Sequence, residues 1–260
     1  MGEPFDAIGF KVTDEPSYHA LAEEAHQRGA LTRSTREQAT LHGCCWQLGE
    51  GLEVWTMLYE SKDGLFYADC RPAFRGRHVF ALYPWEITEY EEDGEAAVRA
   101  LIEGAETEII FELQNITEIN PSVFRERALT ATISGLAYRA KMHRRAIEPT
   151  LARLGEVSVR KRISENDFVV RGEILYWREI QNPRTESKLL WIYVDTGKVK
   201  LEVMVNRADL KGQIRRGAWL SAEVWLQGHI LSEQELESRY EGVDTEFSPV
   251  HYWAILRREN

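Results

Sequence analysis

Alternating apolar and polar residues between positions 168 and 227 constrain the fold of this chain more than any other feature. Four strand-like runs occupy residues 168–177, 189–195, 199–205 and 219–227, and a polar loop, a "DTG" turn and a short connector separate them. Successive side chains of a β-strand point to opposite faces, so alternation over runs of this length is typical of half-buried strands. We therefore predict a β-structure for this part of the chain.

The same alternation assigns side chains to two faces. One face is uniformly aliphatic, with Leu190, Ile192 and Val194 in the second run as examples, and we expect it to line an interior. The opposite face would then meet water or a partner. It collects Trp177, Trp191, Tyr193, Trp219 and Trp225, with Lys200 and Arg171 nearby.

Several features of this region resemble an OB-fold, a five-stranded, partly open β-barrel. They are Gly172 inside the first run, the "VDTG" hairpin and the segment "LKGQIRRGAWLSAEVWLQGHI", and the resemblance covers residues 156–260 with "VHYWAIL" (250–256) as a fifth strand. It implies binding of oligonucleotides, oligosaccharides or proteins, most often on the face of the second and third strands.

Residues 5–75 predict a strand at 5–12, a helix that begins after Asp14 and ends at Gly29, and three strands at 40–49, 52–60 and 65–74. A less regular repeat follows, with strands at 78–90 and 107–117 and helices at 93–104 and 146–155. Residues 128–142 fit either a strand or a helix, and we favour a strand. The predicted fold class is thus α+β: a βαβββ-type domain at 1–155 followed by an OB-like barrel at 156–260.

Two βαβββ units in series resemble the vicinal-oxygen-chelate architecture in element order. In that family, strand residues supply His and Glu ligands to a metal in a cleft. The run 5–12 contains neither residue type, so the resemblance assigns no ligands here.

The charge of the chain indicates which class of partner the aromatic face can bind. The chain has a net charge of −10, and the segment 232–246 carries six acidic residues against Arg239 alone. Such a surface repels phosphate. We therefore expect a protein contact, within the chain or between chains, and we keep single-stranded nucleic-acid binding through Trp191, Tyr193, Lys200 and Arg171 as the alternative. A third hypothesis is a small-molecule or enzymatic site in the N-terminal domain.

Catalytic and metal-binding patterns are weak. His19, Glu23 and His26 share one helical face and could hold a metal, but this face is polar and is more typical of a solvated surface. The P-loop, the dinucleotide fingerprint and the GxSxG elbow are absent. We expect no cofactor, no membrane span and a cytoplasmic binding or assembly module. Cys44, Cys45 and Cys70 are expected to be buried thiols.

Overall fold

The chain folds mainly into β-strands. A computed structural model describes residues 3–36, 39–154 and 164–231, and these contain fourteen strands and two α-helices. The predicted α+β class is therefore wrong, since strands dominate both halves of the described chain. Among the same residues, no helix has the length and apolar composition needed to cross a membrane.

The chain begins with two helices, α1 (Glu3–Ala7) and α2 (Glu15–Arg28). The predicted strand at 5–12 is wrong: Phe5 accepts the backbone N–H of Phe10 at 3.0 Å, and Gly9 ends the turn with φ +89°. The predicted helix after Asp14 is confirmed. Asp14 and Ser17 each accept the other's backbone N–H, a reciprocal cap that satisfies the first turn.

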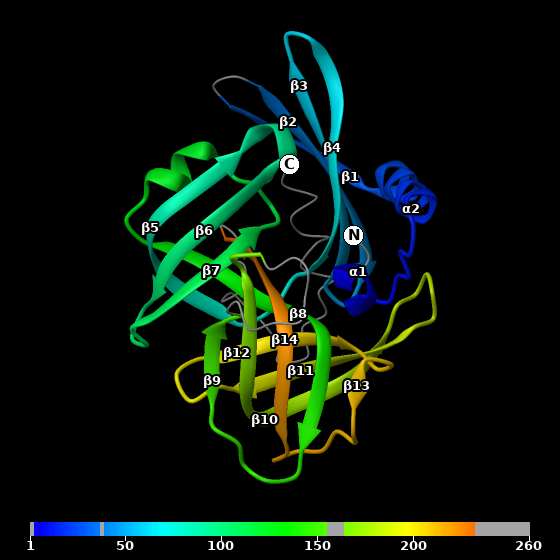
Figure 1. Cartoon of the computed structure of the whole chain (residues 1–260). Coiled ribbons are helices and arrows are strands. Elements are labelled where there is room, and N and C mark those ends of the chain that lie inside the picture. The colour runs from blue at the N-terminus through cyan, green and yellow to red at the C-terminus, as the bar shows by residue number, and fades with distance from the viewer. Residues whose placement is uncertain (1–2, 37–38, 155–163, 232–260) are drawn as a thin grey trace, which may run out of the picture.

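Two β-sheets carry the rest of the fold (Figure 1). The first has the antiparallel order β1–β2–β3–β4 and consists of β1 (Ala30–Thr35), β2 (Thr40–Gly49), β3 (Leu52–Ser61) and β4 (Gly64–Phe74). The second has the order β11–β12–β8–β5–β6–β7–β14–β10–β9, with β13 beside β8. Its strands are β5 (Val79–Tyr90), β6 (Glu95–Ile102), β7 (Thr107–Leu113), β8 (Leu129–His143), β9 (Thr150–Arg153), β10 (Asp167–Gln181), β11 (Lys188–Asp195), β12 (Lys200–Asn206), β13 (Leu210–Lys211) and β14 (Trp219–Ile230), with 3-10 turns at Glu91–Asp93 and Pro121–Arg125.

Two segments predicted as helices are strands. Residues 93–104 contain β6, in which Ala96, Val98, Ala100 and Ile102 are buried on one face with a period of two. Pairing with β5 and β7 on both sides overrides the helix propensity of its Ala and Glu residues. Residues 146–155 contain the short edge strand β9. The strand favoured for 128–142 is confirmed as β8.

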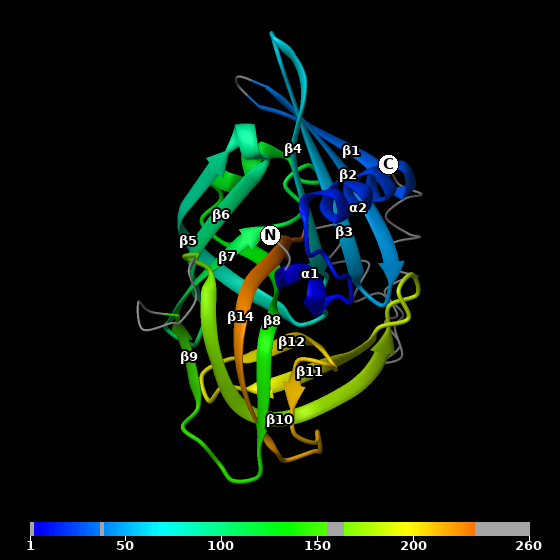
Figure 2. The same ribbon diagram turned by 45° about the vertical axis from the view of Figure 1, so that its right-hand side comes forward.

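Five strands of the second sheet close into a ring through their backbone pairing (Figure 2). Backbone pairing runs β10–β11–β12–β8–β14 and back to β10, and the β12–β8 pair is parallel. The strands predicted at 168–177, 189–195, 199–205 and 219–227 are confirmed as β10, β11, β12 and β14. Residues 250–256, expected as the fifth strand, lie outside the described residues. The fifth strand of the ring is β8, which comes before residue 155 in the sequence. A domain division at residue 155 stays a prediction.

The ring has the aliphatic interior that the alternation predicted. Leu190, Ile192 and Val194 of β11 are fully buried, as are Leu220 and Val224 of β14. A second apolar cluster lies outside the ring, where α1, α2 and the first sheet pack on ring residues that include Leu189, Met204 and Trp225. Part of the ring's outer face is therefore covered by the chain itself.

A buried ionic cluster links the first sheet to β14. Glu53 of β3 accepts hydrogen bonds from the Trp55 indole at 2.8 Å and from the Arg75 guanidinium at 3.1 Å. One of its carboxylate oxygens also lies 3.1 Å from His229 Nε2. Arg75 also pairs with Glu118 at 2.8 Å. The Arg75, Glu53 and His229 side chains lie in the interior, where charges are retained when they are paired.

Candidate functional site

A β-bulge in β10 decides which aromatic residues reach the outer face of the ring. The pairing of β10 with β11 skips Leu175, so Tyr176 lies opposite Tyr193, and Trp177 lies opposite Ile192. Directly paired residues share a face of the sheet. Trp177 consequently packs against the interior cluster, and its expected outward position is wrong.

Four rings form a continuous row on the outer face, here called the aromatic stripe: Tyr176, Trp191, Tyr193 and His78. Tyr176 contacts Trp191 edge-on at 5.8 Å between centroids, and Trp191 lies parallel to Tyr193 at 6.3 Å. The Tyr193 hydroxyl and His78 Nδ1 are 3.1 Å apart. Tyr176 is 57% exposed at one end of the stripe, while the other three rings are half-buried. The row is thus rigid and still partly open.

A buried carboxylate holds the stripe in place. Glu202 of β12 accepts the indole N–H of Trp191 at 2.9 Å and the backbone N–H groups of Arg77 and His78 at 2.5 and 3.0 Å. Burial raises the pKa of Glu202, although these donors oppose the shift. One carboxylate therefore ties β11, β12 and the segment before β5 together behind the rings.

A groove of about 470 Å³ continues from the His78 end of the stripe. It lies between the turn after β6 and the β11–β12 hairpin. Burial, followed by the nearby Lys200 ammonium, lowers the pKa of His78, which keeps this ring neutral at pH 7. The residues that line the groove are His78, Val79, Phe80, Ala81, Ile102, Glu103, Gly104, Ala105, Asp195, Gly197, Lys198, Val199 and Lys200.

The structure brings together only part of the predicted aromatic site. Trp191, Tyr193 and Lys200 meet at the stripe and groove, as expected from their alternation. Trp225 is only 7% exposed and packs in the cluster with α1 and α2. Arg171 is exposed, but it lies on the part of β10 that pairs with β14 rather than β11.

Sequence reasoning missed Tyr176, Arg178 and His78. The bulge that turns Tyr176 and Arg178 outward leaves no signal in an alternating run. Arg178 lies over the Trp191 ring at 5.7 Å and pairs with Glu50. His78 comes from a distant segment, and only the fold places it beside Tyr193.

The candidate metal ligands of α2 have separate partners. His19 pairs with Glu15 at 3.5 Å, Glu23 accepts from Gln27 at 3.2 Å, and His26 lies 3.4 Å from the Thr56 hydroxyl. Within residues 3–36, 39–154 and 164–231, no three His, Cys, Asp or Glu side chains are grouped to hold a metal ion.

The three cysteines are buried, and burial raises the pKa of the Cys44 and Cys70 thiols. A raised pKa disfavours the nucleophilic thiolate. His42, two residues before Cys44 on β2, contacts the Glu60 carboxylate at 2.7 Å.

Residues 156–228 match the family described as "Domain of unknown function, E. rectale Gene description (DUF3881)". The matched segment includes β10 to β13 and most of β14. No curated protein matches the chain.

Proposed function

We propose that the chain is a non-enzymatic binding module that contacts a protein partner through the aromatic stripe and the groove beside it. The observation that carries this proposal is the stripe: four rings in consecutive contact, fixed by a buried carboxylate and open at the Tyr176 end. Aromatic residues with polar tips are enriched in protein interfaces, because they provide large contact areas with few rotatable bonds.

The position of the stripe is consistent with an OB-type barrel. If the ring is such a barrel, β11 and β12 are its second and third strands, and these strands form the face that most often binds a partner. In the described chain, Trp225 is used for packing within the chain. The stripe and the groove remain for a contact with another molecule.

Charge favours a protein over a nucleic acid on this face. Lys198 and Lys200 of the groove are balanced by Asp195 and Glu103, and the fully buried Glu202 lies behind the rings. A phosphate backbone gains little from a surface without excess positive charge. A mixed surface around aromatic anchors suits a protein segment with its own charges of both signs.

We also propose a reducing, cytoplasmic setting, which the burial of all three cysteines supports.

A photo-crosslinking experiment in the protein's own host tests the contact. Lys200 is replaced by p-benzoylphenylalanine, and the matched control carries the same replacement at Lys62, an exposed residue of the β3–β4 turn. We expect discrete adducts from position 200 that position 62 does not give. An adduct of twice the chain mass would identify a second copy of the chain as the partner.

Loss of the adduct in the Tyr193→Ala variant would tie the contact to the stripe. No adduct at position 200, or the same adducts at both positions, would contradict the proposal.

A further inference from the structure

A row of cations crosses another part of the ring's outer face. Cross-strand pairing places Lys211 of β13 beside Lys141 of β8, Lys141 opposite Ser221 of β14, and Ser221 opposite Arg171 of β10. Paired residues share a face, and adjacent strands are about 4.8 Å apart. The three cations therefore lie on a line about 14 Å long. In the part of the chain that the structure describes, none of them has an ion-pair partner.

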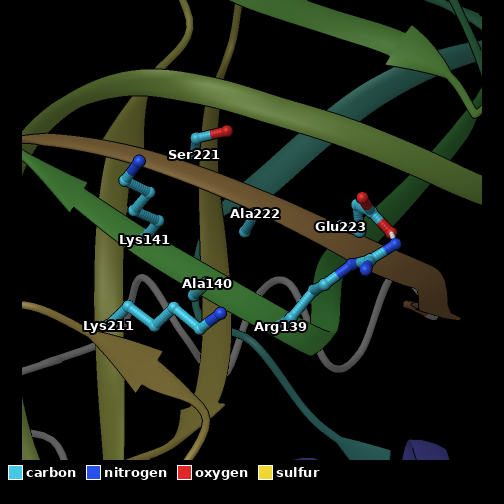
Figure 3. Close-up of a pocket in the computed structure, with 7 residues that line it drawn as sticks. All are labelled: Arg139, Ala140, Lys141, Lys211, Ser221, Ala222 and Glu223. Atoms are coloured by element: carbon cyan, nitrogen blue, oxygen red, sulfur yellow. Dashed lines mark hydrogen bonds and ion pairs between the residues drawn. The ribbon is translucent and has the colours of Figure 1, made fainter.

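A shallow pocket of about 200 Å³ lies within this row (Figure 3). Lys141 and Lys211 extend from neighbouring strands, and the Ser221 hydroxyl lies on the adjoining strand. Arg139 is turned toward Glu223, and their charged groups are 2.6 Å apart. The pocket therefore offers two ammonium groups, with which no described carboxylate forms an ion pair, and a hydroxyl; this donor set suits phosphoryl oxygens.

Two loops extend the positive charge at one end of the ring. Trp219 at the start of β14 lies opposite His143 at the end of β8, so the loop after β8 and the loop before β14 meet there. We call the whole surface the cationic face. Its cations are Arg139, Lys141, Arg144, Arg145, Arg171, Lys211, Arg215 and Arg216. The acidic residues on the same elements are Glu148, Asp167, Glu173, Glu179, Asp209 and Glu223, of which Asp167 is buried and Glu179 lies on the part of β10 that pairs with β11.

This distribution is opposite in sign to the chain's net charge of −10. Like charges on directly paired residues, as at Lys141 and Lys211, reduce stability unless an anion offsets them. A positive stripe on one face of a domain is the electrostatic signature of a polyanion-binding surface.

The remaining chemistry of the cationic face distinguishes among polyanions. The large apolar side chains that are exposed in the described chain lie on other surfaces, such as Tyr83 and Trp85 of β5 and Tyr176 beside β11. Membrane insertion and stable protein contacts both need apolar area, whereas a phosphate backbone does not. Half-buried Trp219 offers a ring at the border of the cationic face, where an unpaired base can stack.

We propose that the cationic face binds the phosphate backbone of single-stranded nucleic acid, with Lys141, Lys211 and Arg171 as phosphate contacts and Trp219 as a stacking residue. This site is separate from the aromatic stripe, so either contact can fail without the other. It also differs from the nucleic-acid site expected from the sequence, which shared only Arg171 with it.

Fluorescence anisotropy of a labelled oligothymidylate of about 20 nucleotides, titrated with the full chain, tests the proposal. We expect binding at about 50 mM salt that weakens steeply toward about 200 mM. The logarithm of the binding constant falls with the logarithm of salt concentration by about 0.7 per neutralised phosphate on a single strand. Replacing Lys141, Arg171 and Lys211 with alanine should therefore reduce the slope by about 2 and weaken binding at least about tenfold at low salt.

The matched control replaces Lys11, Lys62 and Lys188 with alanine, which removes the same charge from exposed positions on other surfaces. The control should keep the wild-type slope. Trp219→Ala should weaken binding without changing the slope, because the indole carries no charge.

Polyglutamate and phosphatidylserine vesicles serve as competitors. No anisotropy change at low salt, or an equal slope change in both triple variants, would overturn the proposal. Competition by polyglutamate or by the vesicles at equal anion concentration would also overturn it, in favour of an acidic protein or a membrane.

Discussion

Glu53→Gln tests how the first sheet is fastened to the ring. Glu53 is fully buried and contacts Trp55, Arg75 and His229. Burial by itself would raise the pKa of Glu53, but the charges of Arg75 and His229 and the hydrogen bonds together lower it to about 2. The carboxylate is therefore ionised at neutral pH, and glutamine removes its charge while keeping its shape.

The expected loss of stability follows from the contacts that remain. Removing one partner of a buried ion pair costs about 3–5 kcal/mol. Arg75 still has Glu118 at 2.8 Å, and the glutamine oxygen can still accept the Trp55 indole N–H. We therefore expect the Glu53→Gln substitution to lower the free energy of unfolding by an amount at the lower end of this range, about 3 kcal/mol. For a chain of this size, that corresponds to a fall in Tm of about 6–12 °C at pH 7, measured by circular dichroism.

The pH dependence gives an independent check. The folded-state pKa of Glu53 lies below its ordinary value of 4.5, so the stability it provides is fully present above pH 4.5 and is lost as the pH falls toward 2. The difference in Tm between the wild type and Glu53→Gln should shrink over that range. Glu60→Gln, on the same strand but 53% exposed, is the control. A Glu53→Gln variant within about 2 °C of this control at pH 7 would refute the reasoning.

Two further substitutions probe the interior. Burial, with the Glu95 and Asp69 charges, raises the pKa of Glu112 to about 8 against the opposing effect of Arg71, so the wild type should lose stability as the pH rises from 4.5 to 8. Glu112→Gln should melt like the wild type near pH 5 and at a higher temperature above pH 8, and an equal difference at both pH values would contradict this expectation. Trp225→Ala should lower the unfolding free energy in urea by about 3–5 kcal/mol, because the indole fills the cluster beneath α1. A loss below about 1 kcal/mol would show that this side chain is not packed within the chain.

The sequence predicted the strands of the ring well because their burial is one-sided. Alternation correctly placed Leu190, Ile192 and Val194 inside, and the cap at Asp14 correctly began α2. The helix predicted for residues 93–104 was wrong. The Ala and Glu residues of β6 favour a helix by local propensity, but pairing with a neighbouring strand on each side makes this segment a strand.

Long-range pairing could not be predicted from local patterns. Nothing in residues 129–143 indicates that β8 closes a ring with strands from residues 167–230, and nothing near Leu175 marks the bulge that turns Tyr176 outward and Trp177 inward. The cationic face was missed for the same reason. Lys141, Arg171 and Lys211 are far apart in the sequence, and only strand pairing places them on one face.

Hydroxyl-radical footprinting tests most directly whether the ring has two separate binding faces. Side-chain oxidation is quantified by mass spectrometry with and without saturating oligothymidylate at low salt. We predict protection of Trp219 on the cationic face, with Tyr176, Trp191 and Tyr193 oxidised as in the unbound chain. Protection of the aromatic stripe with Trp219 unprotected would contradict the division and would place the nucleic acid where we propose a protein.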